Sequence, residues 1–160
     1  MLKRHFLFAA TAFAVLAGCA STSPPVSVAD SIAALPQLTT LNSLIAKAGL
    51  TDTLKTTGPF TVFAPSNEAF AKVPAKIMEA LVNDPAKLKA VLTYHVISGK
   101  VMAADVKNGN SKTVNGANLA LSRAGDFVTV EEALVQTPDI SATNGVVHIV
   151  DSVLMPPASR

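Results

Sequence analysis

Serine, histidine and aspartate are the side chains of a nucleophilic triad, and this chain offers one candidate set: Ser66, His148 and Asp151. In a triad the aspartate orients the histidine, which takes a proton from the serine. If residues 146–154 form a strand, His148 and Asp151 are three positions apart and point to opposite faces. Ser66 also lacks the Gly-x-Ser-x-Gly turn that exposes a nucleophile. We therefore expect no catalytic residues and no enzymatic activity, with a hydrolase using Ser66 as a remote alternative.

Metal ligands are equally sparse. Beyond the first few residues the chain has two histidines, His95 and His148, far apart in the sequence, and it has a single cysteine. These residues do not match the short ligand spacings of zinc sites, and no carboxylate spacing is typical of a calcium site. The chain also has no glycine-rich phosphate loop. We expect no metal and no small-molecule cofactor.

The only cysteine, Cys19, follows a segment that is typical of secretory signals. Lys3 and Arg4 give this segment a positive start, and residues 6–16 form an apolar run that is too short to span a bilayer. The sequence Leu-Ala-Gly-Cys that ends at Cys19 resembles the lipobox of bacterial lipoproteins, in which the cysteine is lipidated after cleavage. A lone cysteine forms no internal disulfide, so lipidation explains it better. The alternative is a cysteine that merely ends a discarded signal.

These features predict a chain in three parts. A lipoprotein signal peptide covers residues 1–18, a lipidated cysteine and tether cover residues 19–26, and one domain covers residues 27–157. The tether is small, polar and proline-bearing, as suits a short extended linker. Ala20 stands where an aspartate would indicate retention at the inner membrane, so resemblance to known sorting signals favours the outer membrane. The expected location is the bacterial cell envelope, with the domain periplasmic or exposed at the surface.

Composition and charge limit the kinds of partner. The apolar fraction of 49% and the charged fraction of 15% indicate one ordered globular domain. Two of the 13 basic residues, Lys3 and Arg4, lie in the signal, and the remaining 11 balance the 11 acidic residues. A neutral surface without a basic stripe argues against nucleic acid as a partner.

The apolar spacing changes from helical to alternating near Tyr94. A helix is predicted over residues 38–48 with Gly49 as its end, and Ser66, Pro74 and Asp84 mark three further helix starts. Strands are predicted at 60–63, 95–97, 112–114, 118–122, 127–130, 133–136 and 145–154, with a hairpin turn at 115–116. Helices followed by strands predict an α+β fold whose second half is an antiparallel sheet.

Three segments closely resemble the signatures of the fasciclin family. GPFTVFAPSNEAF (58–70) resembles the first signature and NGVVHIVDSVLMP (144–156) the second, while LTYHVISGKV (92–101) occupies the place of the Tyr-His segment. The resemblance covers about residues 27–157. It implies a single fasciclin domain, a wedge of two β-sheets with several α-helices mainly from the N-terminal half. Glu131-Glu132 is a departure, because relatives often have a tighter Asn-Gly turn there.

The resemblance also implies a function in cell adhesion or matrix assembly. In adhesion proteins of the family, a Tyr-His and a Pro-Asp-Ile segment are associated with integrin-type receptors, and they map onto Tyr94, His95, Asp139 and Ile140. Structural alternatives exist for each. The rings of Tyr94 and His95 would be buried with bonded polar tips, Asp139 would be a loop residue that ends a strand, and Ile140 would pack in the core.

We therefore expect a lipid-anchored, extracytoplasmic protein that binds a protein or polysaccharide surface ligand and is attached to the membrane by its lipid. An envelope scaffold, whose domain only stabilises a periplasmic or outer-membrane assembly, is the alternative from another class. No residue pattern in the chain specifies the ligand.

Overall fold

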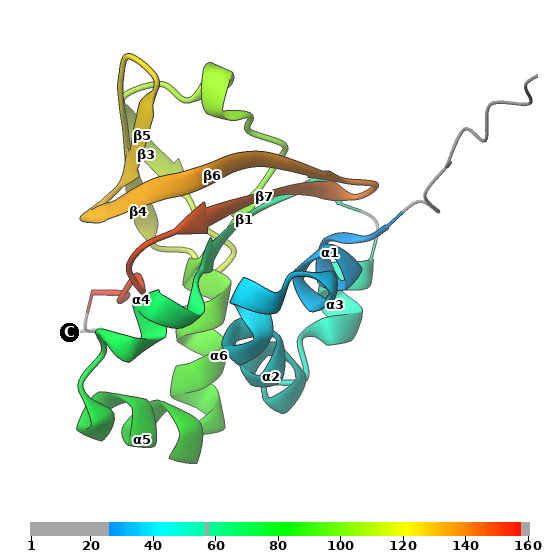
Figure 1. Cartoon of the computed structure of the whole chain (residues 1–160), viewed down its shortest axis with the longest axis vertical. Coiled ribbons are helices and arrows are strands. Elements are labelled where there is room, and N and C mark those ends of the chain that lie inside the picture. Colours follow the sequence, from blue (N-terminus) through cyan, green and yellow to red (C-terminus); the bar gives the residue numbers. More distant parts are fainter. Residues whose placement is uncertain (1–25, 57, 158–160) are drawn as a thin grey trace, which may run out of the picture.

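Helices come first along the chain and most strands come later, as the sequence predicts (Figure 1). The computed structural model describes residues 26–56 and 58–157, so the predicted signal peptide, Cys19 and most of the tether lie outside the described residues. The helices are α1 (Val28–Ala34), α2 (Thr39–Lys47), α3 (Thr51–Lys55), α4 (Asn67–Ala71), α5 (Ala75–Asn83) and α6 (Pro85–Tyr94), with 3-10 turns η1 (Pro36–Leu38) and η2 (Ala103–Asp105). The strands are β1 (Phe60–Pro65), β2 (Val96–Ser98), β3 (Gly109–Lys112), β4 (Asn118–Ala124), β5 (Phe127–Val130), β6 (Ala133–Ala142) and β7 (Gly145–Val150). Among these described residues, no helix is long and apolar enough to cross a membrane.

The helix ends follow the predicted capping signals. The Ser66 hydroxyl accepts a hydrogen bond from the Ala69 N–H at 3.2 Å and so begins α4. The Asp84 carboxylate accepts from the Lys87 N–H at 3.2 Å and begins α6. Gly49, after α2, has a φ of +67°, a conformation that glycine adopts without strain. These three predictions are confirmed.

The seven strands form one hydrogen-bonded order, β2-β1-β7-β6-β5-β4-β3. The predicted wedge has one part formed by β2, β1 and β7 and another formed by β5, β4 and β3. Strand β6 joins these two parts, because its first residues pair with β5 and its later residues pair with β7. At the outer ends of the order, Ile97 of β2 forms a bridge with Thr113, just after β3. The sheet is therefore nearly closed, which protects its two edge strands from pairing with other chains.

Strands β1 and β7 run parallel, which the prediction of an antiparallel sheet misses. Phe60 to Pro65 align with Gly145 to Val150 in register. Every residue of β7 and all but the first of β1 are buried, because these central strands are covered on both faces. The parallel arrangement places the two family signatures side by side (Figure 1).

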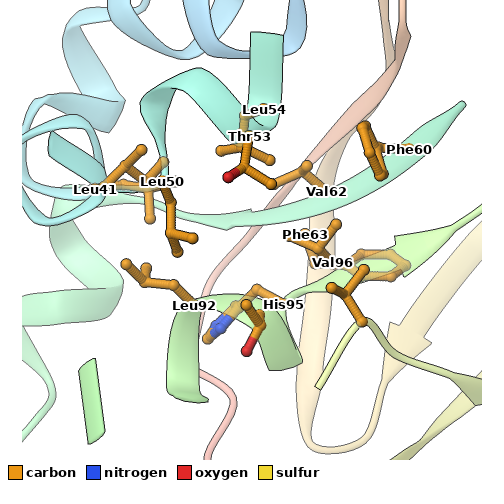
Figure 2. Close-up of a pocket in the computed structure, with 13 residues that line it drawn as sticks. Leu41, Leu50, Thr53, Leu54, Phe60, Val62, Phe63, Leu92, His95 and Val96 are labelled. Atoms are coloured by element: carbon orange, nitrogen blue, oxygen red, sulfur yellow. The ribbon is translucent and has the colours of Figure 1, made fainter. Parts of the chain in front are cut away.

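Two apolar clusters cover the opposite faces of these central strands. One contains residues of α1, α2, α3 and α6 together with Val62 and Val147, and the other contains Phe63, Tyr94 and the inward side chains of β4 and β5. The helical cluster is incompletely filled beside β2. A pocket remains there between α2, α3, β1 and α6 (Figure 2).

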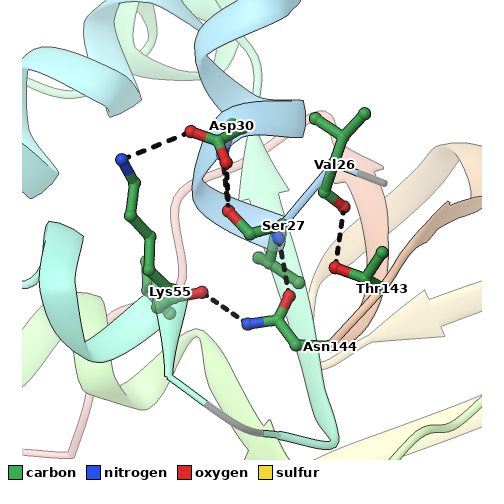
Figure 3. A network of polar contacts seen from close by, with 8 residues as sticks. Val26, Ser27, Asp30, Lys55, Thr143 and Asn144 are labelled. Carbon is green, nitrogen blue, oxygen red and sulfur yellow. Dashed lines mark hydrogen bonds and ion pairs between the residues drawn. The ribbon is translucent and has the colours of Figure 1, made fainter. Parts of the chain in front are cut away.

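Asn144, in the turn between β6 and β7, ties the beginning of the domain to the sheet (Figure 3). Its side-chain oxygen accepts from the Val28 N–H at 2.8 Å, and its amide group donates to the carbonyls of Leu54 and Thr56, both at 2.8 Å. The neighbouring Thr143 N–H donates to the Val26 carbonyl at 2.9 Å. The Asn144 carbonyl also accepts from the Phe60 N–H at 3.0 Å. One turn therefore holds the starts of α1 and β1 and the end of α3.

Asn144→Ala removes three hydrogen bonds to backbone groups of two other segments. We expect it to lower the free energy of unfolding by about 2 kcal/mol. Each backbone group left unpaired costs roughly 1 kcal/mol, and part of this cost is recovered where water forms a hydrogen bond with the group. Urea denaturation measures this change. Asn110→Ala is the matched control, because Asn110 lies exposed on β3 and its side chain forms no hydrogen bond among the described residues. Equal stability of the two variants would contradict the role of Asn144.

Candidate functional site

Tyr94, at the end of α6, is buried with no exposed surface. Its hydroxyl contacts the Glu131 carboxylate and lies 3.2 Å from the Asn118 carbonyl oxygen. Burial, and after it the Glu131 carboxylate, raises the pKa of the Tyr94 hydroxyl. The ring therefore joins α6 to the β5–β6 turn inside the second apolar cluster, which is the structural alternative considered for this residue.

His95 is 2% exposed and is held by two backbone groups. Its Nδ1–H donates to the Val91 carbonyl at 2.8 Å, and its Nε2 accepts from the Leu154 N–H at 3.0 Å. Because Nε2 accepts, the ring is neutral with its proton on Nδ1. Burial lowers the pKa of His95 to about 4. The ring links the helix to the C-terminal segment and presents neither nitrogen to solvent.

In His148 on β7 the two ring nitrogens have the opposite roles to those in His95. Its Nδ1 accepts from the Asp139 N–H at 3.1 Å, and its Nε2–H donates to the Val101 carbonyl at 2.8 Å. Burial is the main cause that lowers the pKa of His148, against the Val101 hydrogen bond and the nearby Asp139 carboxylate. The ring also stacks on Phe63, with ring centroids 5.5 Å apart. His148 therefore joins β7, β6 and the segment after β2.

Asp139 lies in a bulge inside β6, whereas the structural alternative expected a loop at the end of a strand. Between Thr137 and Ile140 the pairing with β7 shifts by one residue, and Asp139 has a φ of +59°. Its carboxylate accepts from the Ala103 N–H at 2.8 Å and remains 35% exposed. The bulge is thus held from both sides, by His148 and by η2.

Ile140 is partly buried and packs against the helical cluster, as its structural alternative expects. Pro138, before the bulge, is exposed. Of the four predicted contact residues, the structure leaves Asp139 and Ile140 partly accessible and encloses Tyr94 and His95. Asp139 and Ile140 adjoin along β6, while Tyr94 and His95 lie at the junction of α6 with β2.

Glu131 is a structural partner that the sequence reasoning missed. It lies in the β5–β6 turn with a φ of +54°, and its carboxylate meets the Tyr94 hydroxyl. From the sequence, the Glu131-Glu132 pair indicates only a different turn. The signal for this contact is a carboxylate at a position where relatives often have a tight Asn-Gly turn.

The catalytic set considered in the sequence does not assemble. The Ser66 hydroxyl caps α4, and the Asp151 carboxylate accepts from the Leu134 N–H at 2.9 Å and lies 3.7 Å from the Lys72 ammonium. His148 bonds to neither of them. Within residues 26–56 and 58–157, no group of three metal-ligating side chains is gathered either.

The sequence of residues 36–156 matches the profile of the fasciclin domain. The chain belongs to the fasciclin-domain family. It is 40% identical to the immunogenic protein MPB70 of Mycobacterium bovis over 84% of this chain and 70% of the relative. It is 38% identical to the cell surface glycolipoprotein MPB83 of the same species, over 77% of this chain and 57% of that relative.

The fold comparison agrees with this assignment. A FAS1 domain pair from the insect cell adhesion molecule fasciclin I superposes with a TM-score of 0.68, at 16% identity, over 82% of this chain and 51% of that chain. The α+β wedge expected from the three signature segments is thus confirmed. One domain of this chain corresponds to about half of that pair.

The hydrogen bonds of the two histidines predict opposite tautomers at pH 7. We expect His95 to carry its proton on Nδ1 and His148 on Nε2, because each remaining nitrogen accepts a backbone N–H. Long-range proton–nitrogen NMR spectra distinguish the two forms. The same tautomer for both rings would contradict these contacts.

The lowered histidine pKa values also predict a pH-dependent stability. Below about pH 6.5 an unfolded histidine binds a proton, while folded His95 stays neutral down to about pH 4. The unfolded state therefore binds more protons in this window, and stability falls as the pH falls. For His95 alone we expect a loss of about 2 kcal/mol between pH 7.5 and pH 5.

Urea midpoints at these two pH values measure the loss. Asp30 and Asp84, whose pKa values are lowered from 3.8, remain ionised above pH 5 and do not contribute. An unchanged urea midpoint would contradict the lowered pKa of His95, because it would mean that the folded and unfolded states bind the same number of protons in this pH range.

Proposed function

We propose that this protein is an exported, lipid-anchored binding module of the cell envelope that acts in adhesion, without catalysis. Membership of the fasciclin family supports the binding function, and fasciclin I is itself described as a cell adhesion molecule. The relative MPB83 is described as a cell surface glycolipoprotein, which supports the proposed lipidation at Cys19. The outer membrane is the proposed site of attachment.

The contact site that we propose is the β6 bulge at Asp139 and Ile140. The observation that carries this assignment is the fixed, partly exposed Asp139 carboxylate, held at a positive φ by His148 and Ala103. A rigid backbone loses little conformational entropy when it binds a partner. An exposed carboxylate beside an apolar side chain suits a protein or polysaccharide ligand that offers a cation or hydrogen-bond donors.

Tyr94 and His95 contribute to this function indirectly in our proposal. Both rings are enclosed, and each bonds α6 to a distant segment: Tyr94 to Glu131 and His95 to Leu154. They would thus hold the wedge that presents the β6 bulge. Substitution of either residue would disturb folding before it disturbed a contact.

Cys19→Ser tests the lipid anchor. In cells that produce the full chain, the original cysteine is expected to place the protein in the membrane fraction. The serine variant is expected to move to the soluble fraction, since serine has no thiol to carry the lipid. Fractionation followed by mass spectrometry of the N-terminal peptide measures both effects. Ala20→Ser is a matched control, and equal distribution of the original chain and the Cys19→Ser variant would refute lipid anchoring.

Asp139→Asn tests the binding site without disturbing the bulge. Asparagine tolerates a positive φ and keeps an oxygen for the Ala103 N–H, so only the charge is lost. We expect stability to change by less than about 1 kcal/mol and adhesion of protein-bearing cells to fall several-fold, because exposed charged contacts contribute about 1 kcal/mol. A cell-attachment assay measures the second effect.

Asp126→Asn, in the exposed β4–β5 turn, is the control for charge alone. Equal attachment by the two variants would remove Asp139 from the contact site. Protease shaving of intact cells separates adhesion from scaffolding. A domain that resists cleavage in intact cells but is cut after lysis faces the periplasm, which would favour the scaffold and contradict adhesion.

A further inference from the structure

The backbone and the carboxylate of Asp139 lie near the same ring nitrogen of His148. The Asp139 N–H donates to Nδ1 of His148 at 3.1 Å. Oδ1 of the Asp139 carboxylate lies 4.0 Å from Nδ1 and accepts instead from the Ala103 N–H at 2.8 Å. One nitrogen is thus close to a donor and to an acceptor of the same residue, and its own proton decides which of the two it can bond.

A proton on Nδ1 of His148 would reverse the choice. A neutral ring accepts at one nitrogen, whereas a protonated ring donates at both. The Nε2–H of His148 can donate to the Val101 carbonyl in either state. At Nδ1, however, two donors would face each other, and the nearby acceptor would be Oδ1 of Asp139. This oxygen needs to approach by about 1 Å to reach the usual hydrogen-bond distance.

Asp139 is the charged residue that faces His148. Strands β1, β6 and β7 contain no other acidic or basic side chain apart from His148 itself, and β1 presents the ring of Phe63. On the side of Val101 and η2, the charged residues are exposed or bonded to backbone carbonyls: Lys100, Asp105, Lys107 and Arg123. Within the described ranges, none of these four forms an ion pair with His148. The carboxylate of Asp139 is therefore the counter-ion available to a protonated ring.

We propose that His148 is a proton-dependent positioning residue for the contact site at the β6 bulge, an inference that rests on the adhesion function proposed above. When a proton from solvent binds Nδ1, the Asp139 carboxylate leaves the Ala103 N–H and pairs with the imidazolium. The bulge then loses both hydrogen bonds that fix it, and the carboxylate is no longer available to a ligand. The contact site is thus held ready at neutral pH and is released in acid.

The same carboxylate makes His148 the first of the two buried histidines to bind a proton as the pH falls. Burial lowers the pKa of both rings, but the negative charge of Asp139 opposes this effect only at His148. Both nitrogens of His95 bond to backbone groups, and burial lowers its pKa to about 4. The change at the bulge therefore precedes protonation of His95.

NMR titration from pH 7.5 to pH 4.5 tests the rearrangement, with the full chain carrying Cys19→Ser so that no lipid is attached. The ring signals of His148 and the backbone N–H signals of Ala103 and Asp139 are expected to shift with one common midpoint, because one proton breaks both hydrogen bonds. The N–H signal of Leu154, which bonds to His95, is expected to shift at lower pH. An Ala103 signal that stays constant while His148 titrates would overturn the proposal, as would a His148 ring that stays neutral until the domain unfolds.

Asp139→Asn tests the pairing with the imidazolium. Removal of the negative charge is expected to move the His148 midpoint to lower pH, because the protonated ring loses its counter-ion. Asp126→Asn, in the exposed β4–β5 turn, removes an equal charge away from His148 and is expected to leave the midpoint unchanged. Equal midpoints in the two variants would refute the pairing.

Attachment of protein-bearing cells on both sides of the His148 midpoint tests the consequence for adhesion. Attachment by the original chain is expected to fall several-fold in acid, to the level of Asp139→Asn, whose own attachment should not change with pH. His148→Asn keeps an acceptor near the Asp139 N–H and binds no proton, so its attachment should also be independent of pH. If this variant fails to fold, Asp139→Asn still decides the question.

The two proposals fail in different ways. An equal loss of attachment in acid by the original chain and by Asp139→Asn would refute control by His148. Normal attachment by Asp139→Asn at pH 7.5 would instead remove Asp139 from the contact site. The NMR titration contains no ligand, so it reports the rearrangement of the bulge whether or not Asp139 contacts a partner.

Discussion

The parallel pairing of β1 with β7 is the constraint on which the rest of the structure depends. It joins the strand that follows the first three helices to the last strand of the chain, so nearly the whole domain lies between the two partners. The pair is buried on both faces, with the helical cluster on one side and the second cluster on the other. The close approach begins at Gly145, where an added Cβ would lie 2.0 Å from the Phe60 carbonyl oxygen. Only glycine fits this register.

The two buried histidines extend this central pair into the surrounding segments. Each ring accepts one backbone N–H and donates to one backbone carbonyl, so it bonds polar backbone groups inside the core. His148 serves the β6 bulge in this way, and His95 serves the C-terminal segment. A side chain that both donates and accepts while neutral suits this position, which explains why residues that first suggest acid–base chemistry are part of the framework.

The sequence predicts the helix ends well, because helix caps depend on residues close together in the chain. Ser66, Asp84 and Gly49 are examples. The hairpin at 115–116 is predicted less well, since β3 ends at Lys112 and the turn to β4 is longer than two residues. The parallel β1–β7 pair could not be found from periodicity, since a buried apolar run carries no information on its partner. The β6 bulge was missed for a related reason. The sequence favours an end of the strand at Asp139, after Pro138, whereas the distant His148 and Ala103 keep Asp139 within β6. The sequence is consistent with burial of Tyr94 and His95, but it does not indicate their partners Glu131 and Leu154, which are remote along the chain.

The attachment of Val26 to the β6–β7 turn determines how mechanical tension would cross the domain. If the domain is anchored through its N-terminal segment, as we propose, a pull on the anchor would reach Val26, whose carbonyl is held by Thr143. Thr143 directly follows β6, and the bulge at Asp139 lies in the same strand. Tension between an anchored N-terminus and a ligand at the bulge would therefore run along one strand and its pairing with β7. The helices and the apolar pocket would lie to the side of this path and bear little load.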